Sequence, residues 1–260
     1  MPSTPACTLT PEQEEGPYYV DYDKLRSDIG EGKPGVPLTV RLAVMDAKRC
    51  MPLSNATLDI WHCDAQGVYS GFTANGGGFG PRGGRGPRGG FPPGPPPDGA
   101  GPDGPPPGGG PLPGGGGPGR GHRALDETRF LRGSQTTNAA GMIEFQTIYP
   151  GWYEGRTIHI HMKVHTGGHV SHTGQLFFPE DVTLKIAKQQ PYAKHVDTYL
   201  TTLSEDHVYE DEHGAAGMVT LARAGEGFLA TATLAVDPEA TPKPVGLGGP
   251  GGFRGPGPRR

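Results

Sequence analysis

Short runs of alternating apolar and polar residues recur along this chain, and they constrain its fold more than any other sequence feature. In the run from residue 38 to 44, every second residue is Leu or Val. Similar runs cover residues 56–63, 142–149, 158–164, 218–223 and 228–236. Because side chains alternate between the two faces of a β-sheet, each run predicts a strand with one buried face. The one helical candidate is the short segment 182–190. We therefore predict an all-β fold, a two-sheet β-sandwich with few short helical turns.

Two stretches of low complexity divide the chain. Between residues 76 and 121, 36 of 46 residues are Gly or Pro, and the end of the chain has a similar composition. Such segments carry too little apolar surface to offset the entropy of ordering them. We expect a disordered insertion at 76–121 and a disordered tail at 241–260. The rest of the chain is interpreted as an arm over residues 1–37 and a single β-sandwich domain over 38–240.

The composition disfavours some classes of partner. The net charge of −4 does not favour nucleic acid or an anionic membrane. The insertion has four arginines with few aromatic residues between them, unlike a typical RNA-binding tract. No apolar run is as long as a membrane span. Neither a basic nor an apolar leader follows Met1, so we expect a cytoplasmic protein, or an exported one if a leader precedes this sequence. Homo-oligomerisation is left open.

Three cysteines, Cys7, Cys50 and Cys63, form neither a disulfide framework nor a zinc knuckle by their spacing. Cys50 precedes a predicted strand and Cys63 ends it, so a bridge between these two is conceivable. Small buried thiols are the favoured interpretation, because the chain is expected to be intracellular.

The stretch from Tyr149 to His161 carries the residues best suited to chemistry. His159 and His161 alternate on a predicted strand, so their side chains share one face, roughly 7 Å apart along the strand. The residues between and after them are apolar and predict a core-facing side. Tyr149 has the parity of a core residue, whereas Tyr153 follows a Pro-Gly turn and is free of that constraint. Tyr153 is therefore the better functional candidate.

The residue types around these histidines narrow the choice of metal. Zinc, iron and copper all accept imidazole, but no HExxH motif, paired carboxylate or cysteine accompanies the pair. A phenolate oxygen suits a hard ion such as Fe(III), and a bound cation lowers the pKa of a phenol. Two alternatives stay open. One is a zinc-dependent hydrolase with a third ligand among His165, His169 and His172, and the other is a non-catalytic β-sandwich binding module.

Several blocks of the chain together resemble the intradiol ring-cleavage dioxygenases, the relatives of protocatechuate 3,4-dioxygenase and catechol 1,2-dioxygenase. The blocks are Trp61-His62-Cys63-Asp64-Ala65-Gln66-Gly67-Val68-Tyr69-Ser70, Phe130-Leu131-Arg132-Gly133, Tyr149-Pro150-Gly151-Trp152-Tyr153, Arg156-Thr157-Ile158-His159-Ile160-His161 and Gly174-Gln175-Leu176-Phe177-Phe178. The resemblance implies a prealbumin-like sandwich and non-haem Fe(III). The ligands that it implies are Tyr69, Tyr153, His159 and His161.

The resemblance also implies a reaction. A catechol-type aromatic diol and O2 would give a cis,cis-muconate-type diacid by cleavage between the two hydroxylated carbons, in the catabolism of aromatic compounds. Tyr153 would accept a substrate proton, while Arg156 and Gln175 would lie near the substrate. The family comparison leaves the particular diol open, since Arg123 or Arg132 could pair with a substrate carboxylate. Tyr18 and Tyr19 are expected to be packing residues, with a pocket-lining role as the alternative.

Overall fold

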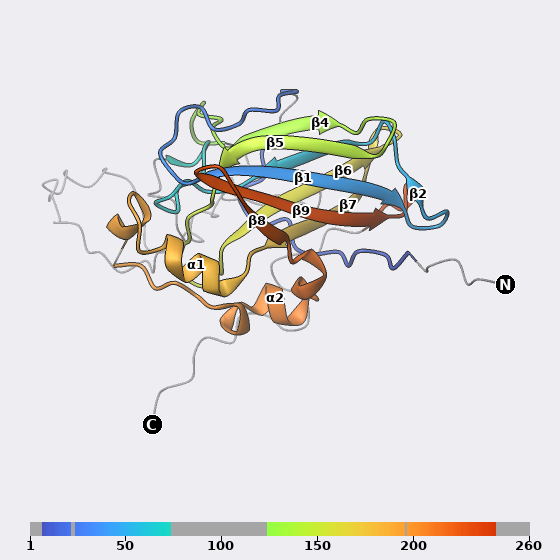
Figure 1. Cartoon of the computed structure of the whole chain (residues 1–260). Helices are drawn as coiled ribbons and strands as arrows, with labels where there is room; N and C mark the ends of the chain where they lie inside the picture. The colour runs from blue at the N-terminus through green and yellow to red at the C-terminus, as the bar shows by residue number, and fades with distance from the viewer. Residues whose placement is uncertain (1–6, 22–23, 74–123, 196, 243–260) are drawn as a thin grey trace, which may run out of the picture.

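The chain forms two β-sheets with short helices along one side, as Figure 1 shows for the computed structural model. The structure describes residues 7–21, 24–73, 124–195 and 197–242. The predicted insertion at 76–121 lies outside the described residues, as does the predicted tail from residue 243 onward. The all-β prediction is confirmed.

The first sheet is built around a central strand, β1 (Pro37–Asp46). It pairs in parallel with β9 and antiparallel with β5, while β2 and β8 extend the sheet. Their bounds are β2 (Met51–Pro52), β5 (Met142–Ile148), β8 (Thr220–Ala224) and β9 (Gly227–Val236). The alternation of burial along β1 follows its apolar residues, so the period-two pattern determines which face meets the core.

The second sheet holds the histidine strand. Its order is β4-β3-β6-β7 and all its pairs are antiparallel. The strands are β3 (Thr57–Trp61), β4 (Arg132–Thr136), β6 (His159–Thr166) and β7 (His169–Phe177). The predicted apolar face of β6 is confirmed, because Ile158, Ile160, Met162 and Val164 all belong to the main core. His159 and His161 therefore face away from that core.

Short helices lie beside the sheets (Figure 1). The predicted helix at 182–190 is found as α1 (Glu180–Ile186). A second helix, α2 (His207–Asp211), was not predicted. It is too short to show a helical period, and the carboxylate of Asp206 caps its first turn by accepting from Val208 N and Tyr209 N. Among the described residues, no helix is long and apolar enough to cross a membrane.

The described part of the N-terminal arm is docked on both sheets. Thr10 N donates to Ala235 O of β9 at 2.8 Å, and Gln13 N donates to Thr173 O of β7 at 2.9 Å. Because β7 ends the strand order of its sheet, the arm supplies hydrogen bonds to a strand edge. The arm is thus part of the folded domain and not a separate segment before it.

The expectation of small buried thiols was wrong for Cys7 and Cys50 and is confirmed for Cys63. Cys7 of the arm forms a disulfide with Cys50, and Cys63 is the buried free thiol. A bridge between Cys50 and Cys63 is excluded because Cys63 packs inside an aromatic cluster, whereas the arm passes beside Cys50. Disulfides persist mainly in oxidising compartments, so the cysteines do not support the intracellular expectation.

We expect Cys7→Ser to lower the free energy of unfolding. The bond closes a sequence separation of 43 residues, and the chain-entropy model assigns about 4 kcal/mol to a loop of this size. Urea unfolding under non-reducing conditions measures the loss. Cys50→Ser and the double variant should each lose the same amount, because all three lack one and the same bond. Additive losses in the double variant would contradict the pairing.

Candidate metal centre

Two loops meet at the start of β6 and bring distant tyrosines together. One loop, 64–71, carries Tyr69, and the turn 149–153 carries Tyr153. The loops pack backbone against backbone, and Gly151 N donates to Asp64 O at 3.2 Å. A Cβ on Gly67 would lie 2.3 Å from Trp152 O, and one on Gly151 would lie 2.3 Å from Asp64 O. Only glycine allows this approach.

The two phenols and two imidazoles converge on one point. His159 Nε2 lies 3.0 Å from His161 Nε2, 3.3 Å from the Tyr153 hydroxyl oxygen and 3.4 Å from the Tyr69 hydroxyl oxygen. Donor atoms bound to one metal ion at about 2.0–2.1 Å are separated by roughly 2.9–3.4 Å at angles between square and tetrahedral. The three distances from His159 Nε2 therefore fit donor atoms that share one ion.

The four side chains are withdrawn from water, which keeps each of them neutral. Burial, and then the charge of Arg156, lowers the pKa of His159 to about 3. Burial also brings the pKa of His161 well below its ordinary value and raises the pKa of both Tyr69 and Tyr153. Neutral imidazole is the form that binds metals, and a cation beside buried phenols would favour their ionised form.

The contacts of the two histidine rings direct their Nε2 atoms at this point. His159 Nδ1 lies 2.6 Å from Thr157 O. A carbonyl oxygen only accepts, so Nδ1 carries the proton and Nε2 keeps a lone pair. The ring of His161 stacks on Trp61 at 5.0 Å between centroids with an interplanar angle of 5°. His161 Nδ1 is buried and has no hydrogen-bond partner among the described residues. The contact of His159 Nδ1 with a backbone carbonyl is the kind that orients a metal-ligating imidazole, whereas the ring of His161 is oriented by its stacking on Trp61.

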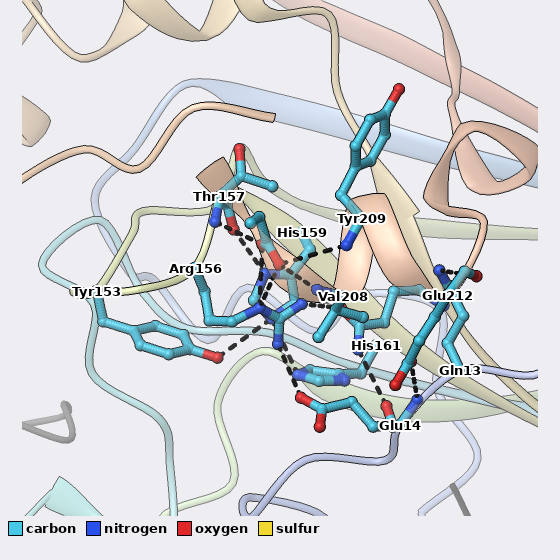
Figure 2. Close-up of polar contacts among 12 residues, drawn as sticks. Gln13, Glu14, Tyr153, Arg156, Thr157, His159, His161, Val208, Tyr209 and Glu212 are labelled. Atoms are coloured by element: carbon cyan, nitrogen blue, oxygen red, sulfur yellow. Dashed lines mark hydrogen bonds and ion pairs between the residues drawn. The ribbon is translucent and has the colours of Figure 1, made fainter. Parts of the chain in front are cut away.

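Arg156 lies beside these donors as a buried cation (Figure 2). Its Nε donates to both carboxylate oxygens of Asp206, at 3.1 and 3.0 Å. Its Nη1 donates to Glu14 Oε1 at 3.3 Å, and its Nη2 donates to Gln175 Oε1. The structure thus brings the predicted residues Arg156 and Gln175 together. Asp206 and Glu14, their partners, were missed by the sequence analysis.

The three-histidine zinc alternative is not supported. His165 pairs with Asp59, and His172 pairs with Glu12, each away from the point where the four donors meet. Within the described ranges, no three His, Cys, Asp or Glu side chains gather to hold a metal ion. A metal at this point would therefore need tyrosine oxygen among its ligands. The set of two imidazoles and two phenols suits a hard, highly charged ion.

Aromatic side chains of the arm line the same site. Tyr18 stacks on Tyr69 with centroids 4.3 Å apart and meets Tyr153 edge-on at 6.2 Å. Burial raises the pKa of Tyr18 to about 12, so this phenol stays protonated. Tyr19 packs on Trp61 at 4.9 Å. The packing interpretation holds for Tyr19, whereas Tyr18 forms a wall of the site.

Arg132, the second candidate for a substrate carboxylate, is bonded to the loop that carries Tyr69. It is buried, and its Nε and Nη2 donate to the hydroxyl and carbonyl oxygens of Ser70 at 2.8 and 2.7 Å. Burial lowers the pKa of Arg132 to about 10. These bonds hold the loop that carries Tyr69, so Arg132 has a structural role. Arg123 lies outside the described residues.

Solved structures of other proteins are similar to this chain over most of its length. No protein-family model and no curated protein matches it. Among solved structures, an intradiol ring-cleavage dioxygenase from Tetranychus urticae has 30% identity and a TM-score of 0.72, over 92% of this chain and 98% of that one. The dioxygenase domain of a carbohydrate-binding fusion protein from Streptomyces sp. SirexAA-E has 25% identity and a TM-score of 0.54, over 88% and 99% of the two chains.

A third relative shares the fold alone. Catechol 1,2-dioxygenase from Acinetobacter sp. ADP1 has 19% identity and a TM-score of 0.52, over 87% of this chain and 62% of that one. The match to the Tetranychus structure defines the class of this protein as a β-sandwich dioxygenase. The chain belongs to the intradiol ring-cleavage dioxygenase family, and it is an enzyme of that class. The alternative of a non-catalytic binding module is therefore wrong.

Proposed function

We propose that this enzyme holds a non-haem Fe(III) ion through Tyr69, Tyr153, His159 and His161. The observation that carries the proposal is that two phenol oxygens and the Nε2 atom of His161 lie within 3.0–3.4 Å of His159 Nε2. The substrate would be a catechol-type diol, cleaved with O2 between its hydroxylated carbons. The product would be a cis,cis-muconate-type diacid that contains both oxygen atoms, so the reaction needs no external reductant.

The bound ion would supply Lewis acidity and a template for the diol, and the side chains would supply the rest. Tyr153 is 7% exposed and Tyr69 is 0% exposed, so Tyr153 lies nearer the solvent side of the site. We assign Tyr153 Oη as the atom that takes a proton from a substrate hydroxyl. Tyr69 would stay in place, held between the ring of Tyr18 and the fixed loop 64–71.

Arg156 would stabilise negative charge as it develops on the substrate oxygens. A guanidinium has five N–H groups. The contacts among described residues engage one N–H group on each of Nε, Nη1 and Nη2 of Arg156, so two N–H groups remain for a substrate. Gln175 would act beside Arg156, because its Oε1 accepts from Nη2. The aromatic walls formed by Tyr18 and Phe72 suit a flat ring.

The purified enzyme is expected to be reddish, because phenolate-to-Fe(III) charge transfer absorbs visible light. Tyr69→Phe and Tyr153→Phe should each shift or weaken this absorption, since each removes one phenolate. The measurement combines metal analysis with a visible spectrum. Oxygen uptake on catechol, protocatechuate and hydroxyquinol then identifies the substrate. A colourless protein whose activity returns with zinc would overturn the proposal, as would spectra unchanged in both variants.

A further inference from the structure

The buried cation of the site has more negative charge around it than neutralisation requires. Asp206, 0% exposed, binds the Nε of Arg156 and balances its charge. Glu14, 4% exposed, adds a second carboxylate at 3.3 Å from Nη1. Burying a carboxylate is costly, and one partner already satisfies the charge of the guanidinium. The presence of Glu14 therefore points to a role other than simple charge balance.

Glu14 closes a ring of three polar contacts with Arg156 and Gln175. Arg156 donates to the Glu14 carboxylate through Nη1 and to Gln175 Oε1 through Nη2. Gln175 Nε2 in turn donates to Glu14 O at 3.0 Å. Both ends of the Gln175 amide are thus committed, which fixes its orientation. Glu14 touches two residues that we place beside the substrate, Arg156 and Gln175, and is itself no metal ligand.

The backbone of Glu14 is anchored as well as its side chain. Glu14 N donates to Glu212 Oε2 at 2.7 Å, and the neighbouring Gln13 Oε1 accepts from Gln175 N at 2.7 Å. Figure 2 shows Gln13, Glu14 and Glu212 on the side of Arg156 away from Tyr153. Because hydrogen bonds hold the backbone at Glu14, its carboxylate has little freedom to move and can fix the guanidinium of Arg156 in one orientation.

We propose that Glu14 is a positioning residue for the reaction. Its carboxylate holds the guanidinium of Arg156 so that the remaining N–H groups face the substrate oxygens, and its carbonyl sets the amide of Gln175. This inference rests on the proposed dioxygenase function. It makes the N-terminal arm a working part of the active site, although Glu14 precedes Arg156 by 142 residues.

The test compares Glu14→Gln with Glu12→Gln in the full-length enzyme. Glu12 lies on the same arm and binds His172 Nδ1 at 2.7 Å and Thr173 N at 3.0 Å, without a described contact to Arg156. Misplaced catalytic groups lose about tenfold to hundredfold in rate, so we expect kcat of Glu14→Gln to fall by that factor with KM nearly unchanged. Glu14→Asp should recover part of the loss. Glu12→Gln should keep kcat within about twofold of the wild type.

A second measurement does not depend on iron. Hydrogen exchange of the Arg156 Nη–H groups, followed by NMR in the metal-free full-length chain, should accelerate in Glu14→Gln and not in Glu12→Gln. An active wild type whose two variants have equal kcat and equal exchange overturns the positioning role alone. A wild type inactive on every diol overturns the proposed function, and this inference with it.

Discussion

Replacing His161 with alanine should remove both the proposed iron and the ring-cleavage activity. The loss of a metal site worth several kcal/mol of transition-state stabilisation corresponds to a rate decrease of about 10³-fold or more. His161 is the better choice for this test because its Nδ1 has no hydrogen-bond partner in the described part of the chain, whereas His159 Nδ1 is bonded to Thr157 O. Iron content per chain and oxygen uptake are the measurements.

The matched control is His165→Ala, on the same strand. His165 is half-buried and bonds to Asp59 at 2.8 Å, away from the four donor atoms. This variant should keep its iron and its activity. If His161→Ala retained one iron per chain, or if His165→Ala lost it equally, the proposed ligand set would be wrong.

Asp206→Asn should destabilise the fold by about 3–5 kcal/mol, the usual cost of breaking a buried ion pair from one side. The Asp206 carboxylate accepts from Arg156 Nε, from Thr157 N at 2.8 Å and from Val208 N at 2.9 Å. An asparagine amide in its place carries no negative charge to balance the guanidinium of Arg156. Its NH2 group would also face the N–H donors of Thr157 and Val208. Urea unfolding measures the change.

The same carboxylate gives a pH dependence with a definite sign. Burial raises the pKa of Asp206, but the charge of Arg156 and the hydrogen bonds outweigh it, and the net pKa lies below the ordinary value. Its contribution to stability is therefore complete above about pH 4–5 and is lost as the pH falls through the lower folded-state pKa. The stability difference between wild type and Asp206→Asn should shrink on acidification below about pH 4.

Asp181→Asn is the control for this prediction. Asp181 is exposed and pairs with Lys185, also exposed, at 2.9 Å. Water screens such a pair, so the unfolding midpoint should not move at any pH. A pH-independent loss in Asp206→Asn, equal at pH 3 and pH 7, would contradict the role of its charge.

The sequence was sufficient for the parts of the fold that depend on local periodicity. Alternation along residues 38–44 predicted the buried face of β1, and parity placed Tyr149 in the core, where it is 0% exposed. The same reasoning distinguished Tyr153 from Tyr149 as the functional candidate. The structure places the Tyr153 hydroxyl oxygen 3.3 Å from His159 Nε2. Tyr69 lies 90 residues before His159, so only the family resemblance could suggest their proximity.

Features made by contacts between distant residues could not be predicted in this way. Glu14 and Asp206 approach Arg156 from opposite directions along the chain, and neither stands in a local pattern that marks it. The Cys7–Cys50 bond likewise depends on the path of the arm. A lone acidic residue or cysteine has many possible environments, and the fold alone selects one of them.

The docking of the arm also determines the order in which the molecule can be completed during synthesis. Thr10 and Gln13 of the arm are made long before their backbone partners, Ala235 and Thr173. Strand β1 likewise can pair with β9 only after β9 has been made. Contacts between such distant residues form slowly. A nascent chain must therefore keep Thr10 and Gln13 unpaired until these partners have been made, and the enzyme gains its full active site late in folding.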